Sequence, residues 1–115
     1  MTAIYAFNLE KRQVNQFDIY VNPVIKGRKR YPYVCSLQNK LFDGLTTRIV
    51  AFVCRDESIA FDKISVPITI SSNKYFVCLN VLATIEESRL QEFVENISDC
   101  REALLAAHDA LISGI

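Results

Sequence analysis

The chain changes its pattern of apolar residues once, and this change limits the fold more than any other feature of the sequence. From position 17 to about position 85, apolar residues alternate with polar ones or form short β-branched runs, which is typical of strands. Beyond position 85 they recur at steps of three and four, the spacing of one helical face. These residues are Leu90, Phe93, Ile97, Cys100, Leu104, Ala107 and Leu111. Strands followed by a helix predict an α+β fold.

Five segments have the composition of strands. Residues 17–21 (FDIYV) alternate in polarity before an Asn-Pro pair breaks the pattern, and YPYVCSLQ at 31–38 resumes it. The basic run KGRKR at 26–30 is therefore predicted to cap a hairpin. The remaining strands are TRIVAFVC (Thr47–Cys54), VPITI (66–70) and KYFVCLNVLATI (74–85). Pro67 has no N–H to donate, so we expect it at a strand start, a bulge or an edge.

Two cues disagree about where the helix begins. The periodicity alone predicts a single helix from about Glu86. Ser98 competes with this start, because its side chain can accept a backbone hydrogen bond as an N-cap, and Asp99 complements the positive end of a helix. We therefore expect the final helix to begin near Ser98, and to stop at Gly114.

Length and charge set the class of protein. A chain of 115 residues is expected to form a single domain over residues 1–115, with one binding surface. Half of the residues are apolar and the formal charge is zero, which argues against a disordered chain and against nucleic-acid binding along the whole surface. The chain has neither a signal-peptide pattern nor a run of about 18 apolar residues, so we expect a cytoplasmic protein without membrane association.

Cysteine and histidine, the usual zinc ligands, are too scattered for a metal site. The cysteines lie far apart without a C-x-x-C pair, and His108 is the one histidine. We expect neither a metal nor a cofactor, and we expect reduced, mostly buried thiols. The four cysteines are Cys35, Cys54, Cys78 and Cys100.

The segment YPYVCSLQNKLFDGLTTRIVAFV at 31–53 resembles toxins of the CcdB family. It has an aromatic-Pro-aromatic start, an extended strand with Gln, then Leu-x-Asp-x-Leu-x-Thr-Arg before an apolar strand. Upstream, QFDIYVN is similar to the opening strand of the family. Downstream, VPITI and NISDCREALLAAHDALISGI match in spacing, including the terminal Gly-Ile. The resemblance covers about 15–115, with one short length difference near 54–65.

The resemblance implies an SH3-like β-barrel of about five to seven strands with a C-terminal α-helix, paired as a symmetric homodimer. It also implies a disordered CcdA-like antitoxin that folds on the dimer and supplies the contact with operator DNA. The end of the last helix in such toxins binds the A subunit of DNA gyrase and traps the enzyme with cleaved DNA. The resemblance therefore implies killing by binding rather than by catalysis.

The expected contact with gyrase is the C-terminal tail. Gly114 and Ile115 carry over directly from the family, and an apolar residue on a rigid helix end can enter a pocket while glycine lets two backbones approach closely. The best-known members have Trp where this chain has Ser113, and the chain contains no Trp. We expect Ile112 and Ile115 to supply the apolar contact instead, with Ser113 hydrogen-bonded to the target.

The antitoxin is expected to use an acidic patch near the start of the helix. A basic antitoxin segment would contact these carboxylates, although a solvated surface is the simpler interpretation. The residues are Glu86, Glu87, Glu92 and Glu95. The KGRKR run, by contrast, is favoured as a solvated hairpin rather than a nucleic-acid grip, because no wider basic stripe surrounds it.

Two other functions stay open. A MazF-like or Kid-like endoribonuclease needs cations for phosphate and a general acid and base near the scissile bond. His108 is the candidate base, with only Asp109 beside it in sequence, and the candidate cations are Arg28, Lys29, Arg30 and Arg48. Alternatively, Ser113 is compatible with a degenerate homologue that binds antitoxin without poisoning gyrase.

Residues 1–14 have no counterpart in the resemblance. They are either an extension or an extra strand, for which IYAF has suitable composition. Translation from Val14 is a further possibility, because GUG encodes valine and serves as a bacterial start codon.

Overall fold

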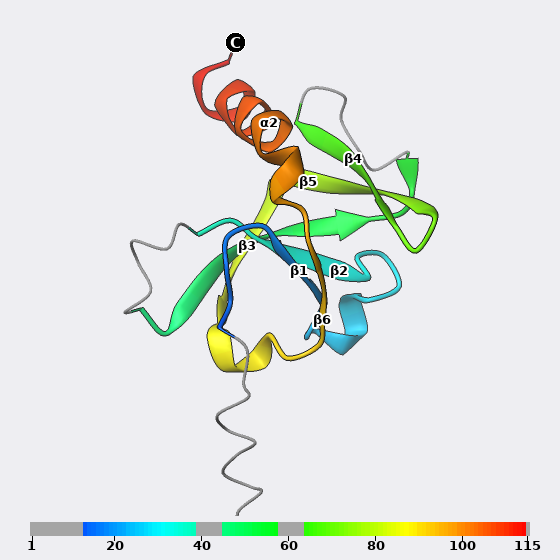
Figure 1. The fold of residues 1–115 in the computed structure, drawn as a ribbon, viewed down its shortest axis with the longest axis vertical. Helices are drawn as coiled ribbons and strands as arrows, with labels where there is room; N and C mark the ends of the chain where they lie inside the picture. Colours follow the sequence, from blue (N-terminus) through cyan, green and yellow to red (C-terminus); the bar gives the residue numbers. More distant parts are fainter. Residues whose placement is uncertain (1–12, 39–44, 58–63, 115) are drawn as a thin grey trace, which may run out of the picture.

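A computed structural model describes residues 13–38, 45–57 and 64–114, and in these residues a six-stranded antiparallel sheet is followed by one α-helix (Figure 1). The order in the sheet is β4-β5-β3-β2-β1-β6. The strands are β1 (Asp18–Val21), β2 (Tyr33–Ser36), β3 (Thr47–Cys54), β4 (Ser65–Ile70), β5 (Asn73–Glu86) and β6 (Phe93–Asn96). The helices are the 3-10 turns η1 (Ile25–Gly27), η4 (Glu87–Arg89) and η5 (Ser98–Cys100), and α2 (Arg101–Ser113).

The sheet curls into a half-barrel, and a break in the pairing of β3 with β5 contributes to the curl. Ala51 pairs with Leu82, but its neighbour Phe52 pairs with Cys78. The extra residues of β5 between these pairs form a bulge, which bends a strand and increases its twist. The fold is thus α+β and consistent with an SH3-like barrel, as predicted, and its six strands fall within the expected range.

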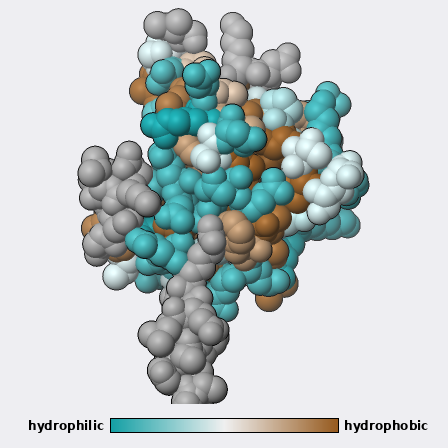
Figure 2. Space-filling model, in the orientation of Figure 1, coloured by the Kyte–Doolittle hydropathy of each residue, from teal (hydrophilic) through white to brown (hydrophobic). Residues whose placement is uncertain are grey.

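The core lies on both faces of the sheet, which explains why β3 is apolar without interruption from Ile49 to Cys54. Ala51 and Val53 contribute to the larger cluster, while Val50, one step along the strand, contributes to a second cluster on the opposite face. Leu104 and Ala107 of α2 close the larger cluster. Outside the core, hydrophilic residues cover most of the face shown in Figure 2.

The strand predictions are confirmed. β3 has the predicted bounds, and the other predicted strands lie within one to a few residues of the observed ones. The basic run caps a hairpin, because β1 and β2 are antiparallel neighbours and η1 lies between them. Pro67 lies on β4, an edge strand of the sheet, where its missing N–H costs no ladder bond.

A helix from Glu86 is wrong, because residues 86–97 contain η4 and the strand β6 instead. β6 pairs with β1, where Glu95 lies opposite Ile19 and Asn96 lies opposite Asp18. This long-range ladder competes successfully with the local helical periodicity.

The helical segment does begin at Ser98, as we expected, but the capping residue is different. η5 starts at Ser98 and α2 follows at Arg101, and neither has a side-chain cap at its N-terminus. Asn96 accepts the hydrogen bond of the Ser98 N–H at 2.9 Å. The chain therefore turns into the helix through an Asn side chain, which mimics a backbone turn.

Phe17 has an unusual backbone conformation for a large buried residue, with φ of 68°. Its N–H donates to the carbonyl of Ser36 and its carbonyl accepts from the N–H of Ile97. The two bonds join β2 to the start of η5, so the surrounding structure fixes this conformation.

Val14 is buried in the second core cluster, so the fold includes the chain from at least this residue. Of the predicted extension or extra strand over residues 1–14, residues 1–12 lie outside the described residues.

The turn between β4 and β5 offers a test of the local backbone. Ser71 and Ser72 form a two-residue loop and both have positive φ, which favours Asn-Gly over Ser-Ser. We expect the double substitution Ser71→Asn and Ser72→Gly to raise the free energy of unfolding by about 1 kcal/mol in urea denaturation. Ser71→Ala is the control and should give no gain. An unchanged or lower stability of the double variant would contradict the argument.

Candidate functional site

The C-terminal end of α2 projects beyond the body of the protein (Figure 1). Leu104 and Ala107 anchor the helix in the core, but Ile112, five residues beyond Ala107, is 71% exposed. Gly114 ends the helix in the left-handed conformation, with φ of 77°, and its N–H donates to the carbonyl of Ala110 at 3.0 Å. The structure thus presents an apolar side chain on a capped helix end.

Ser113 uses its hydroxyl within the helix. Its Oγ donates to the carbonyl of Asp109 at 2.6 Å. Toward a binding partner, the Ser113 oxygen is therefore placed to accept a hydrogen bond rather than to donate one. The structure brings Ile112, Ser113 and Gly114 together on the last turn, and Ile115 lies outside the described residues.

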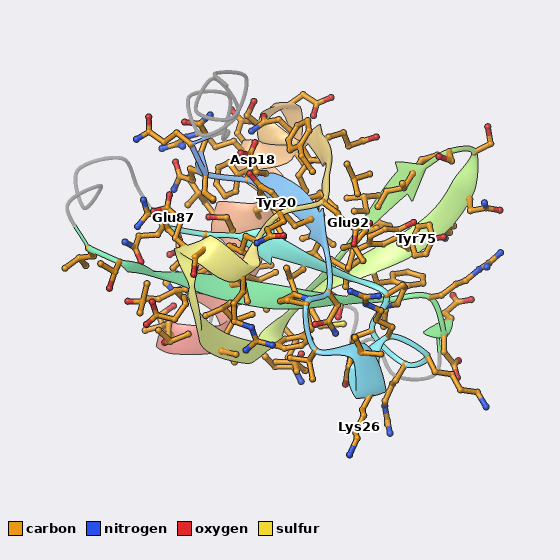
Figure 3. The ribbon with its side chains drawn as sticks, turned by 90° about the horizontal axis from the view of Figure 1, so that it is seen from below. Asp18, Tyr20, Lys26, Tyr75, Glu87 and Glu92 are labelled. Atoms are coloured by element: carbon orange, nitrogen blue, oxygen red, sulfur yellow. The ribbon has the colours of Figure 1, made fainter. Side chains whose placement is uncertain are left out.

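The four predicted glutamates do not form one uniformly acidic surface. They are Glu86 at the end of β5, Glu87 in η4, Glu92 after η4 and Glu95 in β6. Glu87 accepts from the buried Arg48 guanidinium at 3.2 Å, and Glu92 lies 4.0 Å from that of Arg28. Glu87 and Glu92 also lie apart in Figure 3. Two of the four carboxylates are therefore partly neutralised by arginines of this chain.

An apolar groove, which the sequence pattern does not predict, lies between α2 and the β3–β5 part of the sheet. It encloses about 310 Å³. We call it the α2 groove; its lining is Gln16, Phe17, Leu37, Gln38, Ile49, Leu79, Leu82, Leu104, Leu105 and His108. Ile49, Leu82 and Leu105 are large apolar residues that remain exposed there. Ile49 and Leu82 lie in apolar strand segments, so the sequence pattern predicts their burial and cannot distinguish them from core residues. Leu105 lies beside the predicted apolar face of the helix and not on it.

A second, more polar hollow of about 450 Å³ lies near the β1–β2 connection. We call it the η1–η4 pocket; its lining is Val21, Pro23, Arg28, Ser88, Arg89, Gln91 and Glu92. The sequence signal for it was the KGRKR run, but Arg89 comes from a distant segment that no local motif connects to that run.

A comparison with protein families identifies the family to which this chain belongs. The family model described as CcdB protein matches residues 16–114, which include all six strands and α2. The chain belongs to the CcdB family. A search of curated proteins finds no relative that matches it. Membership of the CcdB family makes the chain a toxin of a toxin–antitoxin system.

Within the described part of this CcdB-family chain, the candidate endoribonuclease groups His108, Arg28 and Arg48 are not brought together. His108 lies on α2 at the rim of the α2 groove, with its Nδ1 3.9 Å from Oδ1 of Asp109. The basic connection that carries Arg28 lies at the other end of the molecule from α2 (Figure 1). Arg48 is only 2% exposed and is bonded to Glu87.

Two kinds of site have no support in the described part of the chain. Across residues 13–38, 45–57 and 64–114, no three His, Cys, Asp or Glu side chains are grouped so that they could hold a metal ion. In the same residues no helix is both long and apolar enough to span a membrane.

The thiols of this CcdB-family protein are free and mostly buried, as predicted. Cys54 and Cys78 face each other across β3 and β5, with their Sγ atoms 3.2 Å apart. Burial, with a smaller effect of the bond to Cys78, raises the pKa of Cys54 to about 12, and burial also raises the pKa of Cys35 and of Cys100. These thiols stay protonated at neutral pH, which makes them poor nucleophiles.

Alkylation of the native protein tests this assignment. In iodoacetamide at pH 8, we expect Cys100, the half-buried thiol, to react first, and the other three to react only when the protein unfolds. Mass spectrometry of digested samples gives the order, and a sample in guanidinium chloride shows that all four can react. Rapid labelling of Cys54 in the folded protein would contradict the assignment.

Proposed function

We propose that this CcdB-family toxin poisons DNA gyrase: the end of α2 binds the A subunit and traps the enzyme on cleaved DNA, which blocks replication. The observation that carries the proposal is the projecting helix end, with Ile112 exposed and Gly114 as a left-handed cap. Binding at this end needs no catalytic group. The proposed site of action is the cytoplasm, where gyrase acts on DNA.

The substitution of Ser for the family's Trp sets the strength of this contact. Burial of an isoleucine side chain such as Ile112 contributes about 1.5 to 3 kcal/mol. Ser113 adds little apolar area, and a buried indole contributes more than serine through area and through contact with cations. We therefore infer that this chain binds gyrase with an affinity about tenfold or more below that of a tail with Trp.

Gyrase-mediated DNA cleavage with purified protein tests the proposal. We expect cleaved complexes with the full chain, and a loss of about tenfold or more in potency for Ile112→Glu and for a protein without residues 114–115. Leu45→Glu is the matched control, because Leu45 is also an exposed apolar residue but precedes β3. Ser113→Trp should increase potency by a similar factor.

Each contrary result selects another function. Cleavage by Ser113→Trp but not by the natural chain would identify a degenerate homologue that binds antitoxin without poisoning gyrase. Cleavage by neither protein would overturn the gyrase proposal. Hydrolysis of RNA by purified protein, lost in His108→Ala, would establish a MazF-like or Kid-like endoribonuclease instead.

A CcdA-like antitoxin is the proposed neutralising partner, and operator DNA is reached only through it. We propose that the four glutamates contact basic side chains of the antitoxin. Glu86 and Glu95 are the more available carboxylates, because Glu87 and Glu92 each lie beside an arginine of this chain.

We also propose a symmetric homodimer, paired through the α2 groove. The exposed Ile49, Leu82 and Leu105 come from three different elements and line one groove. Single apolar residues scattered over a surface are common, whereas a contiguous apolar patch is typical of a protein–protein interface. A second copy related by a two-fold axis would cover the same residues on both chains.

Sedimentation measurements test this interface. We expect the natural chain to be dimeric at micromolar concentration and Leu82→Lys to be monomeric, because two lysines would face an apolar surface without partners. Leu82→Met, which preserves volume and polarity, is the control and should remain dimeric. A dimer that persists in Leu82→Lys would place the interface elsewhere.

A further inference from the structure

The η1–η4 pocket gathers cations from two distant parts of the chain. Arg28 donates from Nε to the carbonyl of Asn22 at 2.5 Å, and Arg89 donates from Nη2 to the carbonyl of Pro23 at 3.4 Å. Two guanidinium groups are thus held on consecutive carbonyls of one short segment. Two guanidinium groups that line one pocket repel each other, and a bound anion that contacts both would relieve this repulsion.

Among the described residues, acidic groups neutralise the pocket only in part. Glu92 is the one carboxylate that lines the pocket among the described residues; its side chain is largely exposed and lies 4.0 Å from Arg28. The adjoining connection adds further positive charge from Lys26, Lys29 and Arg30. Lys26 points away from the ribbon into open space (Figure 3). This end of the protein therefore carries an excess of positive charge, although the whole chain is neutral.

The basic connection is also rigid, because a buried asparagine holds it. The Asn22 side chain is fully buried; its Nδ2 donates to the carbonyl of Tyr31 at 2.8 Å and its Oδ1 accepts from the N–H of Val24 at 2.9 Å. The Tyr31 N–H donates in turn to the carbonyl of Gly27. A loop fixed in this way loses little conformational entropy when a partner binds.

Exposed apolar residues lie beside the cations. Ile25 is 73% exposed and Val24 is also exposed, both in the same connection as Arg28. A nucleic-acid backbone would use the cations but would gain nothing from aliphatic side chains without a stacking partner. A peptide with both acidic and aliphatic side chains would use both features of the surface.

We propose that the η1–η4 pocket and the adjoining basic connection bind an acidic peptide segment of a partner protein. Carboxylates of the peptide contact Arg28 and Arg89, and its aliphatic side chains pack on Ile25 and Val24. The site lies at the opposite end of the molecule from the tip of α2 (Figure 1). It therefore does not depend on the proposed binding of gyrase.

Fluorescence anisotropy with a labelled peptide tests the proposal. The probe is a 14-residue peptide in which pairs of Glu flank single Leu residues, and the matched control has Gln in place of every Glu. We expect the Glu peptide to bind the full chain at least about tenfold more tightly than the Gln peptide at low salt, and to weaken as salt is added. Equal binding of the two peptides would overturn the proposal, as would tighter binding of a 14-nucleotide single strand than of the Glu peptide.

Substitutions locate the site. Arg28→Gln and Arg89→Gln should each weaken binding of the Glu peptide by about fivefold. Lys74→Gln is the control for loss of a charge, because Lys74 lies on β5 over the Phe76 ring. Binding that is unchanged in both arginine variants would overturn the site.

A substitution at an exposed position keeps the test independent of folding. Ile25→Glu should abolish the preference for the Glu peptide, whereas Ile25→Gln, which has similar size but no charge, should retain it. Preference retained by Ile25→Glu would count against the proposal. These measurements contain no gyrase. A negative peptide-binding result would therefore not affect the gyrase proposal, and a negative cleavage assay would not affect the proposal of peptide binding.

Discussion

One hydrogen bond between two polar side chains connects the two ends of this fold. Asn96 donates from Nδ2 to the Oδ1 of Asp18 at 2.8 Å, across the pair that β6 makes with β1. The carboxylate of Asp18 is fully buried and also accepts from the N–H of Asn15. Because an unpaired buried carboxylate is costly, the late strand has one register in which both groups are satisfied. That register fixes where the chain leaves the sheet.

The direction of α2 follows from this junction. The same Asn96 accepts from the N–H of Ser98 and so starts the helical segment. Arg101, at the first position of α2, donates to Gln16 at 3.1 Å and stacks over the ring of Phe17. The base of the helix is thus attached to the residues before β1. A helix held at its base and along one side can carry an apolar tip into solvent without support from other elements.

The sequence predicted the elements well where local pattern and tertiary structure agree. β3 has alternate residues on two buried faces, and the continuous apolar run that results was sufficient to locate it. The segment at 86–97 was harder, because β6 is held by its pairing with β1, a contact that no local period encodes. Asp18 and Asn96 are 78 positions apart in sequence, so the bond that fixes the register of β6 could not be predicted from a local pattern either.

The candidate sites follow the same division. The end of α2 was predicted as a contact through the family resemblance, in which Gly114 and Ile115 match the terminal Gly-Ile of CcdB toxins. The α2 groove was not, since Ile49 and Leu82 have the pattern of core residues and only their positions in space leave them uncovered. The η1–η4 pocket depends on Arg89, which a motif search around KGRKR does not reach.

The separation of the basic connection from the tip of α2 has a consequence for how this toxin can change over evolutionary time. Residues that share no contacts act on stability and binding almost independently. A substitution at position 113 therefore alters what the helix tip can hold and leaves the Asn22-braced connection as it was. A change as small as Ser to Trp would thus enlarge the apolar surface of the helix tip without altering the hydrogen bonds that hold the basic connection at the other end.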